Sequence, residues 1–186
     1  MNTDDIVRRV AMEVPDAPSA TIKDMLMWAM ADLCHEGNAW VHSDGPIVVA
    51  ADTDYAELES PADSEPVRVL EVLVDDRPLK AGIHYRQTGP STIRLSFKPQ
   101  ENSLYGSLSV KPLPGKEMPE ALTSLHHETL RHGTLHKLLM LPQPWKKPEQ
   151  AIYHRQHWEA GVTRAKQLAA YGNQAGGARV RPRRFL

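Results

Sequence analysis

The sequence predicts an α+β protein: a bundle of about four helices, an inserted small antiparallel β subdomain and an extended C-terminal arm. Near both ends of the chain, apolar residues recur every three to four positions, as in helices that pack on one side. In the middle, apolar residues alternate with polar ones and prolines separate the runs, as in short strands joined by turns. The expected units are an N-terminal helical pair at 1–42, a β insert at 43–113, a second helical pair at 114–172 and a basic arm at 173–186.

Length, charge and cysteine content narrow the class of protein. A chain of 186 residues with a formal net charge of −1 can bury a substantial core, and its whole surface gives no nucleic-acid signal. Its single cysteine, Cys34, excludes an internal disulfide framework and fits a reducing compartment. The acidic start does not resemble a signal peptide, and no apolar run reaches the roughly 20 residues that cross a bilayer. We therefore expect a protein made in the cytoplasm, with no membrane partner.

Two helices are expected at the N-terminus. Thr3 is placed to cap a first helix that runs to about Val14. Ser19 is placed to cap a longer helix that runs to about Val41, with Leu26, Leu33 and Trp40 on one apolar face. Cys34 lies beside this face and is expected to be a small buried apolar residue.

Two further helices are expected at 119–141 and 148–171, each beginning with a proline at its first position. Gly133 lies in the middle of the first apolar face, where a glycine indicates close approach of a neighbouring helix. Because the connector between the two helices is short, they should be antiparallel, and Gly172 should end the second. The apolar faces of the later three helices, with Trp145 of the connector, predict a bundle core of Leu26, Leu33, Trp40, Leu122, Leu125, Gly133, Trp145, Trp158 and Val162.

Five apolar runs rich in β-branched residues lie between the helical pairs. After an expected break at 42–46, they cover 47–49, 55–58, 67–74, 92–97 and 103–111. A turn at 75–79 leads onto one more short strand, so the insert should hold five or six antiparallel strands.

No residue pattern in the chain points to catalysis. His132 and His136 stand four apart on a predicted helix and could share a metal ion, but Arg131 occupies the position that would complete a His-Glu-x-x-His motif after His127. An acidic run that could do acid–base chemistry is better explained as a solvated strand edge; it comprises Asp52, Asp54, Glu57 and Glu59. We therefore expect no catalytic site, no metal, no cofactor and no enzymatic activity.

The arm combines a small, polar segment at 174–178, expected to be flexible, with a basic, apolar end. Its charged and anchoring residues are Arg179, Arg181, Arg183, Arg184 and Phe185. Such a segment cannot form a core of its own, which suits an arm that orders on a partner. A basic tail with no specific role is the alternative.

Four short patterns accompany this order of elements. They are Met118-Pro119-Glu120-Ala121-Leu122, Gly133-Thr134-Leu135-His136-Lys137-Leu138-Leu139, Pro142-Gln143-Pro144-Trp145 and the terminal Arg183-Arg184-Phe185-Leu186. With the two N-terminal helices and the proline-punctuated insert, the chain resembles the head-to-tail connector (adaptor) proteins of tailed bacteriophages, which bind beneath the portal. The likeness covers nearly the whole chain and is one of architecture and spacing.

The resemblance implies a structural virion protein at the neck, where it joins capsid to tail. Members assemble as a ring, commonly of twelve copies, under the portal protein. It implies that the bundle forms the ring wall, that the β insert contacts tail or nozzle proteins, and that packaged DNA passes through the lumen. It also implies that the arm residues Arg179, Arg181, Arg183, Arg184 and Phe185 bind the portal. Two alternatives remain: a DNA-binding or packaging-associated protein that uses the basic tail, and a metal-dependent enzyme built on the histidine-rich helix.

Overall fold

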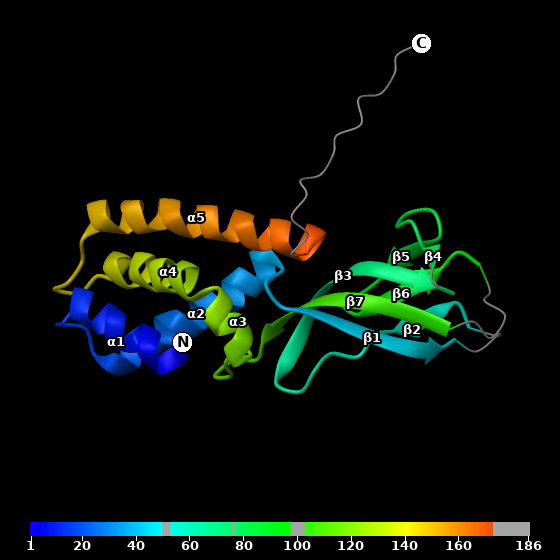
Figure 1. Ribbon diagram of the computed structural model, residues 1–186, viewed down its shortest axis with the longest axis horizontal. Helices are drawn as coiled ribbons and strands as arrows, with labels where there is room; N and C mark the ends of the chain where they lie inside the picture. The colour runs from blue at the N-terminus through cyan, green and yellow to red at the C-terminus, as the bar shows by residue number, and fades with distance from the viewer. Residues whose placement is uncertain (50–52, 76, 98–102, 173–186) are drawn as a thin grey trace, which may run out of the picture.

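The computed structural model describes residues 1–49, 53–75, 77–97 and 103–172, so the predicted arm lies outside the described residues. Within them the fold is α+β, as predicted, with helices at one end of the molecule and strands at the other (Figure 1). The helices are α1 (Thr3–Glu13), α2 (Ser19–Gly37), α3 (Glu120–Leu125), α4 (His127–Met140) and α5 (Pro148–Tyr171). The strands are β1 (Val41–Val48), β2 (Tyr55–Glu57), β3 (Ser64–Val74), β4 (Arg77–Pro78), β5 (Tyr85–Gln87), β6 (Thr92–Leu95) and β7 (Ser103–Pro112).

Helix α1 is capped by Asn2 and not by Thr3 as predicted. The Asn2 side chain accepts a hydrogen bond from the Asp5 N–H at 3.0 Å, and the Asp5 carboxylate accepts one from the Asn2 N–H at 3.2 Å. This reciprocal capping box satisfies two backbone donors at once. Thr3 is buried instead, and its hydroxyl donates to Glu117 at 2.6 Å.

Helix α2 ends earlier than its apolar pattern predicts. It stops at Gly37 because Asn38 adopts a left-handed conformation with φ of 50°. At Gly37 the backbone comes close to α5, since an added Cβ would lie 3.1 Å from the Ala165 Cβ. Trp40 therefore precedes β1 and is not on a helix, although it is buried as expected.

The helix predicted at 119–141 is two helices. His126, with φ of −106° and ψ of 14°, separates α3 from α4. The break changes the helical phase, and Leu125 is 58% exposed. The prediction that Leu125 belongs to the core is therefore wrong. Leu122 and Trp145 are only partly buried against the core. The other predicted core residues are buried, namely Leu26, Leu33, Trp40, Gly133, Trp158 and Val162.

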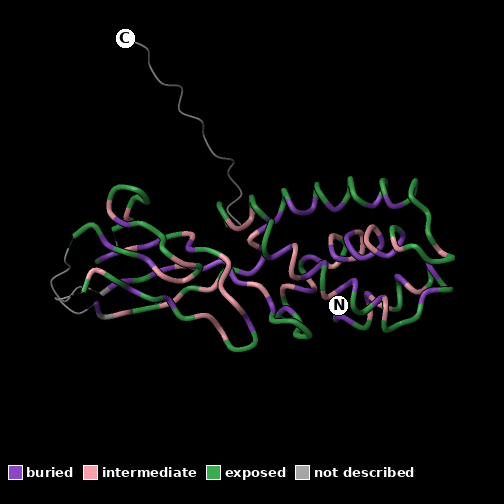
Figure 2. The backbone as a smooth tube through the Cα atoms, turned by 180° about the vertical axis from the view of Figure 1, so that it is seen from behind, coloured by how far each residue is buried: buried purple, intermediate pink, exposed green. Residues whose placement is uncertain are grey.

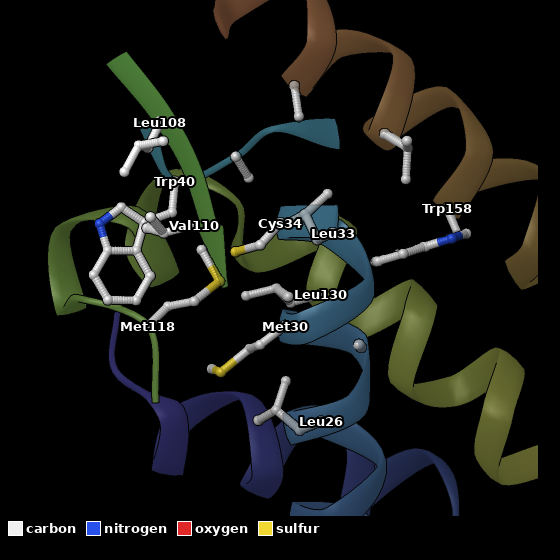
Figure 3. Close-up of a cluster of buried hydrophobic side chains, with 14 of the residues drawn as sticks. Leu26, Met30, Leu33, Cys34, Trp40, Leu108, Val110, Met118, Leu130 and Trp158 are labelled. Carbon is white, nitrogen blue, oxygen red and sulfur yellow. The ribbon is translucent and has the colours of Figure 1, made fainter. Parts of the chain in front are cut away.

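Helix α5 has the predicted bounds and lies antiparallel to α4. Along α4, Thr129 faces Gly161 and Gly133 faces Trp158, while the His136 ring bonds to the Ala151 carbonyl at 3.1 Å, so one helix ascends as the other descends. Figure 2 shows α5 burying one side along its length and exposing the other. Figure 3 shows the core beneath it, to which α2 contributes Leu26, Met30 and Leu33, α4 contributes Leu130 and α5 contributes Trp158.

The strands form two sheets, which together are called the β lobe. One has the order β1-β7-β3-β4 and the other the order β2-β6-β5, with antiparallel pairing throughout. Leu58 packs directly on Gly106, where an added Cβ would clash with its methyl groups. The expected break at 42–46 is wrong: these residues belong to β1, whose pairing with β7 becomes irregular between Asp44 and Ile47.

None of the described helices has both the length and the apolar character needed to cross a lipid bilayer.

Candidate interaction surface

Helices α4 and α5 meet at two glycines. An added Cβ on Gly133 would strike the ring of Trp158, and one on Gly161 would strike the side chain of Thr129. The prediction that Gly133 marks a close helix approach is confirmed. This contact fixes the side of α5 that faces the bundle and leaves its opposite side to solvent.

A polar cluster of aromatic rings lies at one end of this contact. His132 Nδ1 lies 2.8 Å from His154 Nδ1, so one ring donates to the other. The His132 ring also stacks on His157, with centroids 4.6 Å apart and planes 19° from parallel. Tyr153 meets His157 edge-on at 4.5 Å. Of these rings, the sequence pattern placed only His132 in a candidate site, because the partners come from a different helix.

An arginine holds this cluster next to α1. Arg131 donates to Glu13 at 2.6 Å and pairs with Glu128 at 3.0 Å, so it links α1 to α4. Burial and the nearby charge of Arg131 lower the pKa of His132 to about 4, with smaller contributions from His154 and His157. Burial also lowers the pKa of His154. Both rings are therefore neutral near pH 7, which favours packing between them.

His132 and His136, which the sequence spacing left as a possible metal pair, both contact α5. His136 bonds to the Ala151 carbonyl and His132 to the His154 ring. Within the described ranges, no three side chains of the ligating types are arranged to hold a metal ion. Cys34 is buried, and burial raises the pKa of its thiol to about 12, so it is protonated near pH 7.

Trp28 lies in a groove between α2 and the connector that follows β7. Tryptophan has the largest side chain, yet Trp28 is 62% exposed. The groove is lined by Met27, Trp28, Ala31, Pro112, Leu113 and Pro114, with charged residues around them. We call these six residues the Trp28 groove. A concave apolar site with an exposed tryptophan is typical of protein–protein contacts.

Ion pairs surround the Trp28 groove. Lys137 bonds to Asp32 at 2.6 Å, and its ammonium lies 6.0 Å from the centre of the Trp28 ring. Lys111 pairs with Glu65 at 2.9 Å on the opposite side. The arrangement of an apolar centre and a polar rim resembles that of protein interfaces. Sequence reasoning missed Trp28, although its position two residues after Leu26 places it off the buried face of α2.

The predicted arm residues, Arg179, Arg181, Arg183, Arg184 and Phe185, lie outside the described residues. In the predicted acidic run, Asp52 also lies outside them, and Asp54 pairs with Arg94 at 2.7 Å on the β lobe. Glu57 is exposed on β2. The described part of the acidic run thus lies along β2, which is an edge strand of the three-stranded sheet.

No protein-family model matches the chain, and no curated protein is similar to it in sequence.

Proposed function

We propose that the protein is a structural component of a tailed-phage virion, a head-to-tail adaptor that forms a ring beneath the portal. It joins capsid to tail at the neck, contacts tail or nozzle proteins and surrounds the DNA channel, and it has no enzymatic activity. The sequence resemblance supports this role through the order of helices, β insert and basic arm. The α+β fold agrees with that order.

The observation that carries the proposal is the Trp28 groove. A closed ring of identical subunits needs two different surfaces on each subunit, one for each neighbour. The groove supplies one, with Trp28 as its apolar anchor. The outward side of α5 is the candidate for the other, since Ile152 is 58% exposed there. Contacts of this kind depend on a few central aromatic residues.

Replacement of Trp28 tests this assignment. Trp28→Asp places a charge at the centre of the contact and should raise the protein concentration needed for ring formation on the portal at least tenfold, or about 1.4 kcal/mol per contact. Ile83→Asp is the matched control, since Ile83 is 63% exposed but lies in the β lobe. Mass photometry of each variant mixed with portal protein measures ring formation. Normal assembly of the Trp28→Asp chain would contradict the role of the groove.

Removal of the arm tests the second part of the proposal. A chain lacking 179–186 should keep its folded core, because the buried residues described above precede the arm. It should no longer bind the portal, since four arginines and Phe185 are lost. Far-ultraviolet circular dichroism and co-sedimentation with the portal measure the two properties. If the shortened chain binds the portal as well as the full chain does, the arm is not the portal-binding element.

A DNA-binding role remains the second candidate because of the four arginines in the arm. Contacts to phosphates would make binding fall steeply as salt is raised. A chain that ignores the portal yet binds DNA in this salt-dependent way would replace the adaptor proposal.

A further inference from the structure

One face of the four-stranded sheet is open and leads to the end of α5. A hollow at the junction of bundle and β lobe is lined by residues of β1, β3, β4, β7 and the last turns of α5. A second hollow, further along the same sheet, shares Glu71 and Ser107 with the first. We call the two together the inter-lobe groove; its central lining residues are Val41, Glu71, Leu79, Tyr105, Ser107 and Ala169.

The inter-lobe groove offers polar groups that lack partners in the described part of the chain. Glu71 is exposed and forms no ion pair there. Asn38, which also lines the groove, has a buried side-chain oxygen with no hydrogen-bond donor among the described residues. The exposed Glu71 carboxylate accepts hydrogen bonds, so an occupant rich in donors would satisfy it.

Apolar side chains lie beside these acceptors. Val41 and Tyr105 are partly exposed, and Leu79 is half-buried at the junction. Tyr85 is buried beneath them; burial and the nearby charge of Glu71 raise the pKa of its hydroxyl. The groove thus suits a segment that carries both cations and apolar side chains. The charged residues that line the two hollows are Asp44, Glu71 and Lys166.

The chain's own arm begins next to this groove. Ala169 and Ala170 of α5 line the junction hollow, and α5 ends at Tyr171 (Figure 1). The segment from 173 to 186 spans on the order of 40 Å when extended. A ten-residue strand such as β7 spans roughly 33 Å, so the arm is long enough to follow the sheet face.

We propose that the inter-lobe groove is the docking site for residues 179–186 of the same chain. The arginines match Glu71 and Asp44, because guanidinium groups donate several hydrogen bonds and carry the opposite charge to the two carboxylates. Phe185 supplies an apolar group for the surface formed by Leu73 and Tyr105 in the second hollow. Docking within one chain loses less entropy than docking between chains, because the arm is already tethered to one wall of the groove.

This docking does not require the adaptor role. Its consequence for assembly rests on the proposed function: the portal must displace the arm from the groove before it can bind the arm. A free subunit would then keep its arm covered until a portal is present.

Disulfide trapping in the full chain tests the docking without any portal. In a Cys34→Ala background, Ser107→Cys combined with Phe185→Cys joins the groove to the arm. The control pair is Glu57→Cys with Phe185→Cys, which places the partner cysteine at an exposed position on the other sheet. We expect the groove pair to form disulfides within one chain at least tenfold faster than the control pair. Equal rates, or disulfides that mainly join two chains, would overturn the proposal.

Removal of one charge in the natural chain gives a second readout that needs no engineered cysteines. Trypsin cleaves after Arg179, Arg183 and Arg184, whereas Pro182 blocks cleavage after Arg181, and docking should protect the three sites. Glu71→Gln should therefore speed cleavage of the arm severalfold, whereas Glu57→Gln should leave the rate unchanged. Equal cleavage rates in the Glu71→Gln and natural chains would also overturn the proposal. Portal co-sedimentation of the same variants separates this outcome from a failure of the adaptor role.

Discussion

In the helical bundle, Gly133 of α4 packs against the rigid indole of Trp158 on α5, whereas in the β lobe Gly106 packs against the flexible end of Leu58. The bundle also buries α4 on several sides, while the β1-β7-β3-β4 sheet leaves Glu71 and Tyr105 exposed on its outer face. The bundle is therefore packed more tightly at its glycines, whereas the four-stranded sheet leaves polar and aromatic side chains open to solvent.

Removing the indole that fills the α4–α5 contact should have the largest effect. Trp158→Ala should lower the free energy of unfolding by about 4 kcal/mol, because it leaves a cavity against Gly133. Ile152→Ala on the same helix is the control, since Ile152 is 58% exposed and should change stability by less than about 0.5 kcal/mol. Urea titration measures both. Similar losses in the two variants would mean that this contact does not hold the bundle.

Adding one methyl group at each glycine compares the two regions directly. Gly133→Ala should destabilise the protein by about 2 kcal/mol, because the clash with the Trp158 ring outweighs the gain in helix propensity. Gly106→Ala should cost less than about 1 kcal/mol, since the Leu58 methyl groups can turn aside. The shift in thermal midpoint of each variant measures this. A larger loss for Gly106→Ala would reverse the assignment of rigidity.

Acidification should weaken the bundle through His132 and leave the β lobe unaffected. The pKa of His132 is about 4 in the folded protein, below its ordinary value of 6.5. As the pH falls, His132 is protonated in the unfolded chain before it is protonated in the folded protein. Its contribution to the free energy of unfolding is therefore fully present above about pH 6.5 and is lost as the pH drops toward 4. Because His132 is only partly buried, the loss should be about 1 kcal/mol. In the His132→Gln variant, the free energy of unfolding should vary less with pH over this range. If the variant and the natural chain lose the same stability on acidification, His132 is not responsible for the loss.

Residues with strong local preferences made much of the fold predictable from sequence. Pro148 and Gly172 bracket α5, and period-two alternation located β3 and β7 but not β1. The break at His126 was missed because this residue is neither a glycine nor a proline. The end of α2 had a local signal in Gly37 and Asn38, since asparagine tolerates the left-handed conformation, but the apolar pattern that continues to Trp40 obscured it.

The candidate surfaces were less predictable than the fold. The sequence pattern of α2 could have predicted that Trp28 lies outside its buried face. The groove around Trp28, however, also needs Leu113 from a connector far away in sequence. The inter-lobe groove likewise joins Glu71 of β3 to Ala169 of α5. The ring contacts of His132 with His154 and His157 needed the relative placement of two helices. Such sites arise from packing between elements.

The adaptor proposal is tested most directly by imaging the full chain, alone and mixed with a portal protein from the same source, by negative-stain electron microscopy. We predict closed rings stacked coaxially on the portal. Portal particles without added rings, at protein concentrations well above those used for assembly, would contradict the central claim.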